Sequence, residues 1–518
     1  MQDQPRELRP DLLQRRRTRR ALLGGAAATA IGGAAVAAGV AYGSGGSSQG
    51  SSRSAAQRDS GPQPTPTPNP DRPIDDPRRR AGHLLRRAGF GGTLAEIDQF
   101  AQLSREDAAD RLLNFATIDN SALDARLATP GIDLNQPRPA EMMRWWLTRM
   151  IYTARPLEER MTLIWHGLLT SQVSKIGPQR AKLMIRQNEL FRSMALPRYD
   201  DLVKAVSKDP AMLIYLDTVE SVQAHPNENY ARELMELFTL GAGNYTEQDI
   251  RESARAFTGW RITPPKNTGN QAQDIADWNP QFVIDPRQHD TGAKTFLGKT
   301  GNWGGDDIVG IIMQQPAAGR FITRRLFNEF ANFEPSDKTI DGLVAIWDSS
   351  NHDIRSIVRA ILISDEFYSE RSYRAIVRSP VKFMVNAFRG LELESDLQRG
   401  VNERAVQGMD QVLFEPPNVA GWPGGAAWLS SSTFFARANF LDELLFGRAK
   451  IPPPIPALAA LTTAEDLADR AFAIFLDGKV TDTARQAIVD HAKTLTNPAE
   501  RAATIAYLVL GSPEYQLV

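Results

Sequence analysis

Cysteine is absent from the sequence, and histidine occurs only six times in 518 residues. The lack of cysteine excludes disulfide bonds, thiolate zinc sites, c-type haem attachment, a cysteine nucleophile and a lipidated N-terminal cysteine. No HExxH or P-loop motif occurs, and no GxSxG or GxGxxG motif lies between a strand and a helix. The commonest signatures of hydrolases and nucleotide-binding enzymes are therefore missing.

An excess of charge of one sign is also lacking, because 60 Lys and Arg residues stand against 61 Asp and Glu residues. Residues 1–43 contain seven arginines and three acidic residues, a net charge of +4, which leaves −5 for the remainder. A slightly acidic folded part lacks the positive field that drives binding to phosphate backbones. We therefore expect no nucleic-acid partner.

The N-terminus has the pattern of an export signal. A basic segment, 1–20, is followed by 23 uncharged residues, 21–43, that are rich in Ala and Gly. The pair Arg19–Arg20 indicates a twin-arginine signal, whereas an ordinary secretory signal and a single-pass anchor are the alternatives. We expect export across the bacterial inner membrane, to the periplasm, the cell surface or the medium. Membrane contact is expected only through this segment, if it is not cleaved.

The composition then divides the chain. Residues 44–79 are rich in Gly, Ser and Pro and are expected to form a disordered linker. A main helical domain is predicted over 80–448, and a C-terminal helical subdomain over 449–518, after the proline-rich IPPPIP.

Apolar residues recur mainly at helical spacing within the folded part. The clearest predicted helices are 158–169, 246–259, 318–331 and 381–391. Strand patterns are scarce, and the best candidates, 282–284 and 295–297, are predicted to pair with each other. The predicted fold is mostly α: a large bundle-like domain with a few long loops and one short β-hairpin.

An acidic helix is predicted from about Glu228, within 225–241. Asn229, Glu233 and Glu236 fall at i, i+4 and i+7 and form one stripe. Like charges one turn apart are unfavourable unless they share a proton, a cation or an arginine. We therefore predict Glu233 and Glu236 as catalytic residues and Asn229 as a substrate contact. The alternative is a ladder of ion pairs formed by Glu228, Arg232 and Glu236.

Two histidines complete this prediction. His166 lies in an apolar helix, and His289 precedes Asp290 in a loop. We predict His166 as catalytic, and His289 and Asp290 as ligands of a divalent metal ion. A buried core histidine and ordinary turn chemistry are the alternatives.

The loop 414–433 combines three Pro and three Gly with Trp422 and Trp428. Indole rings on a rigid backbone can form a wall for a carbohydrate, and both residues are predicted to contact substrate. The alternative is that both tryptophans fix the loop to the core.

The ordered motifs of the chain resemble the uncharacterised bacterial family DUF1800 from about residue 80 onwards. They are HLLRRAGFGG, ERMTLIWHGLLTSQ, DPAMLIYLD, NENYARELMELFTLG, YTEQDIRESARAFTGW, HDTGAKTFLG, SPVKFM and FEPPNVAGWPGG. The resemblance implies export, often by twin-arginine signals, and a partner encoded nearby: an exported protein of the phosphatase and sulfatase class. It implies no established activity. One departure is Leu168, where the family usually has a second histidine.

Two functions are consistent with these features. The first is a hydrolase of an extracellular polymer such as polysaccharide, with Glu233 or Glu236 as general acid or base and with His166, His289 and Asp290 orienting substrate or holding a cation. The second is a non-enzymatic helical scaffold of the envelope, or a partner of the co-exported protein. A haem protein with His166 as axial ligand is a third, weaker hypothesis.

Overall fold

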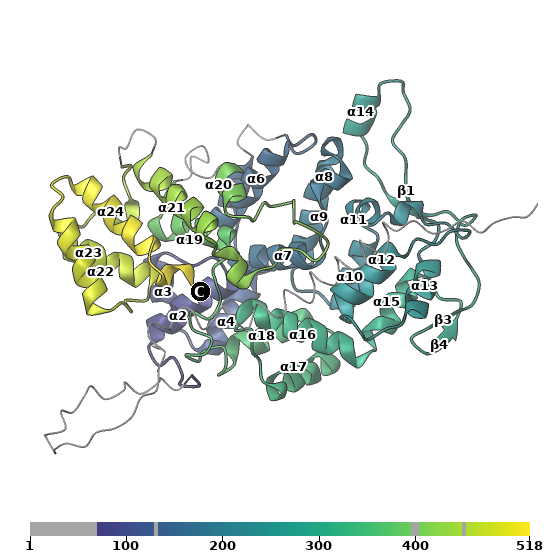
Figure 1. Ribbon diagram of the computed structural model, residues 1–518, viewed down its shortest axis with the longest axis horizontal. Helices are drawn as coiled ribbons and strands as arrows, with labels where there is room; N and C mark the ends of the chain where they lie inside the picture. Colours follow the sequence, from purple (N-terminus) through teal and green to yellow (C-terminus); the bar gives the residue numbers. More distant parts are fainter. Residues whose placement is uncertain (1–69, 129–132, 395–402, 448–451) are drawn as a thin grey trace, which may run out of the picture. The chain divides into compact units, whose positions relative to one another are not determined.

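The computed structural model describes residues 70–128, 133–394, 403–447 and 452–518, and the described part is almost entirely helical (Figure 1). The described residues form one compact unit. The predicted signal segment, most of the predicted linker and the domain boundary at 448–449 lie outside the described residues.

The helices follow one another with short connections. The first group is α2 (Pro77–Ala88), α3 (Leu94–Phe100), α4 (Arg105–Leu113), α5 (Ser121–Leu127), α6 (Pro139–Tyr152), α7 (Pro156–Leu168), α8 (Val173–Ile176) and α9 (Lys182–Ser193). The second group is α10 (Tyr199–Ser207), α11 (Pro210–Tyr215), α12 (Glu228–Glu233), the π-helix η4 (Leu234–Thr239), α13 (Glu247–Ala256), α14 (Gln271–Ala276) and α15 (Gly305–Met313). The third group is α16 (Pro316–Phe330), α17 (Asp337–Ser349), α18 (Ile354–Ile363), α19 (Pro380–Leu391), α20 (Glu403–Gly408) and α21 (Ser431–Phe446). The last is α22 (Ala464–Phe475), α23 (Asp482–Lys493) and α24 (Pro498–Leu510).

Short 3₁₀ turns connect several of these helices. They are η1 (Phe115–Thr117), η2 (Pro178–Arg180), η3 (Thr218–Glu220), η5 (Gly425–Trp428), η6 (Pro456–Leu458) and η7 (Glu514–Gln516).

The four helices predicted most clearly from the sequence are confirmed as α7, α13, α16 and α19. Local chemistry explains their limits. At α13, the Thr246 hydroxyl accepts from the Asp249 amide while the Asp249 carboxylate accepts from Thr246, which forms a capping box. Gly259, three residues beyond the end of α13, has φ +74°, a left-handed conformation that favours glycine.

The few strands pair differently from the prediction. β1 (Trp260–Ile262) pairs with β2 (Phe282–Ile284), and β3 (Lys294–Phe296) pairs with β4 (Lys299–Gly301), both antiparallel. The predicted pairing of 282–284 with 295–297 is therefore wrong. Each strand is three residues long, so no alternating pattern distinguishes the true partner. In Figure 1 the connection between β1 and β2, which carries α14, extends away from the helices around it.

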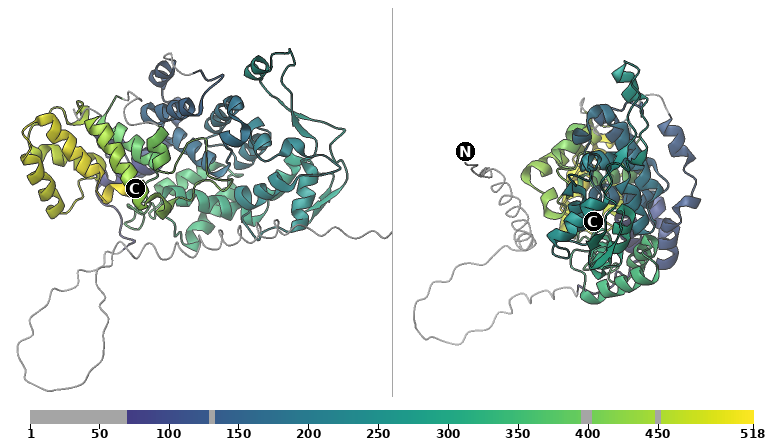
Figure 2. Two further views of the ribbon diagram at one scale, coloured as in Figure 1. Left: turned by 45° about the horizontal axis from the view of Figure 1, so that its top comes forward. Right: turned by 90° about the vertical axis from the view of Figure 1, so that its right-hand side faces the viewer.

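The C-terminal helices are joined to the first described helix rather than separate from it. α24 packs against α21, α22 and α23, and α22 also contacts α3 (Figures 1 and 2). Arg86 of α2 forms a buried ion pair with Asp477, which follows α22, and Tyr373 donates to the same carboxylate at 2.9 Å. This junction fixes one edge of the body in which the candidate site lies.

Candidate functional site

The predicted acidic stripe lies on α12 and η4. The alternative prediction was a ladder of ion pairs through Glu228, Arg232 and Glu236. Arg232 does pair with Glu228 at 3.2 Å, but its second partner is Glu247 of α13, at 2.9 Å, and not Glu236. Glu236 instead accepts a hydrogen bond from Tyr245 at 3.0 Å. The π-helical winding explains the change, because its backbone bonds join residues five apart and the i, i+4 spacing no longer holds beyond Glu233.

The other members of this stripe lie near the surface. Glu233 is half-buried, and Asn229 is exposed. The Asn229 side-chain amide donates to Asp217 at 3.1 Å, and the Lys175 ammonium pairs with the same carboxylate at 2.9 Å. Asn229 therefore already has an acidic partner and belongs to a surface network of hydrogen bonds.

His166 is buried in the core, with 1% of its surface exposed. The centroid of its ring lies 5.3–5.6 Å from the ring centroids of Trp146, Phe414 and Trp422. Its Nε2 accepts a hydrogen bond from the Phe414 backbone amide at 3.2 Å. Burial lowers the pKa of His166 to about 3, so the imidazole is neutral and carries its proton on Nδ1. Its described contacts are aromatic rings and a backbone amide, which makes it an anchor of the tryptophan loop.

His289 and Asp290 form a loop held by α13. His289 Nδ1 lies 2.7 Å from the Thr258 carbonyl, and the Asp290 carboxylate accepts from Arg255 Nε at 2.7 Å. Burial would raise the pKa of Asp290, but Arg255 and the Gly292 amide outweigh it and keep the pKa below its usual value. Within the described ranges no group of three or more His, Asp or Glu side chains is placed to hold a metal ion.

The tryptophan loop, residues 414–428, is bound along the end of α7 (Figure 1). The Val173 amide donates to the Phe414 carbonyl at 3.0 Å, and the Thr170 hydroxyl donates to the Val419 carbonyl at 2.7 Å. Gly421 has φ +80°, and a Cβ at this position would lie 2.3 Å from the Gly167 carbonyl oxygen. Glycine is therefore required for the loop to lie this close to α7.

This loop closes one side of a cavity of about 170 Å³, hereafter the tryptophan cavity. The other walls come from α7, α16 and the segment that leads into α19. Trp422 is half-buried and Trp428 is 5% exposed, so both predicted tryptophans fix the loop and also line a cavity. The remaining polar lining residues are Arg160, Arg325, Asn328, Glu329, Ser379, Lys382 and Gln411.

The charges of this lining do not balance. Glu329 is the one carboxylate among the lining residues, and it pairs with Arg160 at 2.9 Å and with Arg325 at 3.5 Å. Lys382 is 5% exposed. Among the residues that the structure describes, none forms a hydrogen bond or ion pair with the Lys382 amine. Three basic side chains thus face a single carboxylate.

These charges also shift the titration of the cavity groups. Burial would raise the pKa of Glu329, but Arg160 and Arg325 hold it below its usual value, so this carboxylate stays ionised. Burial, together with Arg160 and Arg87, lowers the pKa of Lys382 well below its usual value. Residues on separate helices form this cluster, so no local motif in the sequence announces it.

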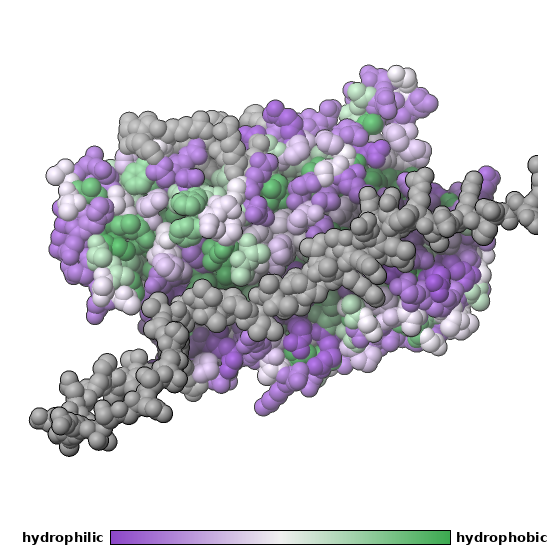
Figure 3. Space-filling model, in the orientation of Figure 1, coloured by the Kyte–Doolittle hydropathy of each residue, from purple (hydrophilic) through white to green (hydrophobic). Residues whose placement is uncertain are grey.

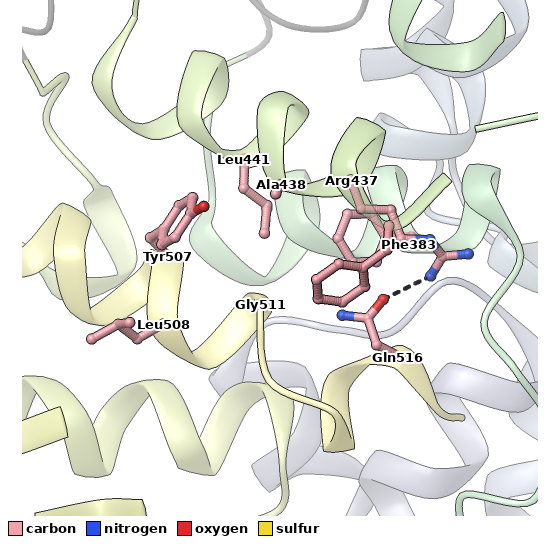
Figure 4. Close-up of a pocket in the computed structure, with 9 residues that line it drawn as sticks. Phe383, Arg437, Ala438, Leu441, Tyr507, Leu508, Gly511 and Gln516 are labelled. Atoms are coloured by element: carbon pink, nitrogen blue, oxygen red, sulfur yellow. Dashed lines mark hydrogen bonds between the residues drawn. The ribbon is translucent and has the colours of Figure 1, made fainter. Parts of the chain in front are cut away.

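A second cavity, of about 230 Å³, lies between α19, α21 and α24 (Figure 4). Its lining is mostly apolar, with Phe383, Leu441 and Tyr507 around it. The Arg437 guanidinium donates to Gln516 at 2.9 Å and also to the Arg378 carbonyl at 2.8 Å. Figure 3 shows apolar residues gathered on the surface over α21, α22 and α24, among polar ones. Phe434 and Phe435, at the start of α21, are 44% and 68% exposed.

The fold is mostly α-helical, and its tryptophan cavity is lined by three basic side chains. The chain belongs to the family described as "Protein of unknown function (DUF1800)", which it matches over residues 83–517. No curated protein and no solved structure matches the chain. In the portion of the chain with described structure, none of the helices has the length and apolar character needed to cross a bilayer.

Proposed function

We propose that this protein binds an acidic sugar, or the acidic end of a polysaccharide, in the tryptophan cavity. The observation that carries the proposal is the charge of the lining, in which Arg160 and Arg325 share the single carboxylate of Glu329, beside Lys382 and two indole rings.

Electrostatics favours an anionic occupant. A buried cation without a partner costs several kcal/mol, and a bound anion removes part of that cost. Arginine also presents paired N–H donors that match a carboxylate. Glu329 takes up only part of the positive charge of the wall, so a second carboxylate is the natural complement.

The volume of the tryptophan cavity and its two tryptophans indicate which class of anionic ligand fits. A cavity of about 170 Å³ is smaller than the roughly 300–1,000 Å³ typical of pockets for drug-sized ligands, so it suits one small group. Trp422 and Trp428 offer apolar faces against which a sugar ring can pack. A uronic acid combines such a ring with a carboxylate.

Titration calorimetry with glucuronate, and with glucose as the neutral match, tests the proposal. We expect glucuronate to bind and glucose to bind at least tenfold more weakly. Arg325→Met should weaken glucuronate binding about 10- to 100-fold, the range for a hydrogen bond to a charged group of about 1.5–3 kcal/mol. Arg324→Met, on the exposed side of the same helix, is the control. Equal affinity for the two sugars, or no binding at millimolar concentration, would reject the proposal.

Polymer hydrolysis is a second proposal, placed on the acidic helix rather than in the tryptophan cavity. General acid–base chemistry by Glu233 and Glu236 is supported by residue type and spacing. The predicted roles of His166 as a catalytic residue and of His289 and Asp290 as metal ligands rest on residue type alone. Release of reducing ends from polygalacturonate by the wild-type protein, lost in Glu233→Gln and Glu236→Gln, would test it. Binding without turnover would instead favour the scaffold or partner function, in a complex with the co-exported phosphatase-like or sulfatase-like protein.

Export through the twin-arginine route is supported by Arg19–Arg20 and the weakly apolar segment that follows them. Replacing both arginines with lysine should leave the precursor inside the cell. Unchanged export of this variant would reject that route.

A further inference from the structure

Lys382 is a buried residue of the tryptophan cavity, and its amine has no hydrogen-bond partner in the described part of the chain. It is the third residue of α19, it is 5% exposed, and it lines the tryptophan cavity. An ammonium group normally donates three hydrogen bonds, and burying it without them is costly. The side chain is therefore held in a place where a solvated ammonium would not be expected.

A second buried lysine shows how such a residue is usually satisfied. Lys294 is 1% exposed, and its ammonium donates to the Asp290 carbonyl at 2.7 Å and to the Gly292 carbonyl at 3.0 Å. Lys382 lacks any comparable set of acceptors among the described residues. The contrast indicates a role for the Lys382 amine other than fixing a loop.

The charged groups that face Lys382 come from several elements. Arg87 of α2, Arg160 of α7 and Arg378 before α19 lower its pKa together with burial, and Glu329 of α16 opposes them. Glu329 is already paired with Arg160 and Arg325, so it gives Lys382 little compensation. Cationic neighbours and an apolar wall are the conditions that keep a lysine amine neutral and nucleophilic.

We propose that Lys382 forms an imine with a carbonyl compound that also bears a carboxylate, such as a 2-oxo acid or the open-chain aldehyde of a uronic acid. This inference rests on the proposed function, because the cationic wall must first hold the carboxylate. Arg160 and Arg325 are the residues that would hold it, which leaves the carbonyl group of a small ligand within the same cavity as the Lys382 amine.

The chemistry balances without an oxidant or reductant. The nitrogen lone pair forms a C–N bond to the carbonyl carbon, and the π electrons of the C=O bond move to oxygen. A proton moves from nitrogen to that oxygen to give a carbinolamine, which then loses water. Amine and carbonyl compound thus become imine and water.

Reductive trapping tests the inference on the unmodified protein. The exported form is incubated with pyruvate or with glucuronate in the presence of cyanoborohydride, and the adduct is located by peptide mass mapping. We expect about one adduct per chain, at Lys382, with Lys294 and exposed lysines such as Lys479 much less labelled. Pyruvate and glucuronate distinguish a 2-oxo acid from a sugar aldehyde.

Two variants and one independent measurement complete the test. Lys382→Arg keeps a basic side chain in the cavity but cannot form an imine, so it should lose the adduct while glucuronate binding remains detectable by calorimetry. Lys294→Arg should keep the adduct. Glucuronate binding without an adduct at Lys382, or labelling confined to exposed lysines, would overturn the imine alone. Absence of both binding and adduct would overturn the proposed function as well.

Discussion

The acidic helix α12–η4 and the tryptophan cavity differ in whether their charged side chains find partners of opposite charge or hydrogen-bond partners. On α12–η4, Glu228 pairs with Arg232 and Glu236 accepts from Tyr245 close to the surface. In the cavity, Arg160 and Arg325 share Glu329, and Lys382 has no carboxylate partner among the described residues. A run of acidic residues in the sequence is therefore not by itself a site, whereas an unbalanced charge inside a closed volume leaves room for a ligand of the opposite sign.

The largest expected effect on stability comes from a third charged cluster, in which a buried carboxylate is fully paired. Glu159 of α7 is fully buried and accepts from Arg192, Arg149 and Trp146 at 2.6–3.0 Å. Glu159→Ala leaves the buried guanidinium of Arg192 and the half-buried one of Arg149 without this carboxylate and should cost about 5 kcal/mol, the upper end for a broken buried pair. Urea unfolding followed by circular dichroism measures the loss. A cost below about 1 kcal/mol, as expected for exposed Asp365→Ala, would contradict the assigned network.

The second effect concerns His166, which anchors the tryptophan loop. Its native pKa of about 3 lies below the ordinary 6.5, so the unfolded chain takes up a proton first as the pH falls. Stability is thus fully present above about pH 6.5 and is lost toward pH 3, by roughly 3 kcal/mol between pH 7 and pH 4. His166→Gln, which keeps a hydrogen-bond acceptor, should remove this part of the acid sensitivity. Unfolding curves that keep the wild-type pH slope would show that His166 is not the group responsible.

The third effect has the opposite sign from the first. Lys382→Met removes a buried amine that lacks a partner among the described residues and keeps most of its apolar stem. We expect a gain in stability of about 1–3 kcal/mol together with weaker glucuronate binding, because the variant no longer buries a polar amine without a hydrogen-bond partner. Thermal unfolding and calorimetry measure both. A strongly destabilised variant would mean that the Lys382 amine is compensated within the native protein.

The smallest effect belongs to the acidic helix. Glu247→Gln removes one of the two carboxylates of Arg232, and its side chain is 67% exposed. We expect a loss below about 1 kcal/mol, since exposed pairs contribute little and salt screens them. The loss should shrink further in 1 M salt. A loss comparable to that of Glu159→Ala would remove the distinction between the two regions.

The helical fold was predictable because its signals are local. Apolar residues at helical spacing and caps such as Thr246 locate α7, α13, α16 and α19 from the sequence. The π-helix η4 was not predicted, since an i, i+5 winding leaves no recognised pattern in the residues. The pairing of the strands depends on how the chain folds back after Gly259. Strands of three residues are too short for their sequence to specify this.

The site was predictable only in part, for a related reason. Trp422 and Trp428 were expected from the unusual composition of their loop, and both line the cavity. Arg160, Arg325 and Lys382 lie on three different helices, where each looks like an ordinary polar position of an amphipathic segment. Their meeting is a result of tertiary packing, which only long-range contacts decide. Glu159, with its buried partners, was missed for the same reason.

The hydrogen bonds and ion pair of α2 affect when the chain can complete its folding. Arg87 donates to the Val518 carbonyl, 431 residues further along, and Arg86 pairs with Asp477. While the ribosome is still adding these distant residues, the two guanidinium groups of α2 have no native partners, and contacts between such remote positions form slowly. The native contacts of α2 therefore form only after this distant region has been synthesised.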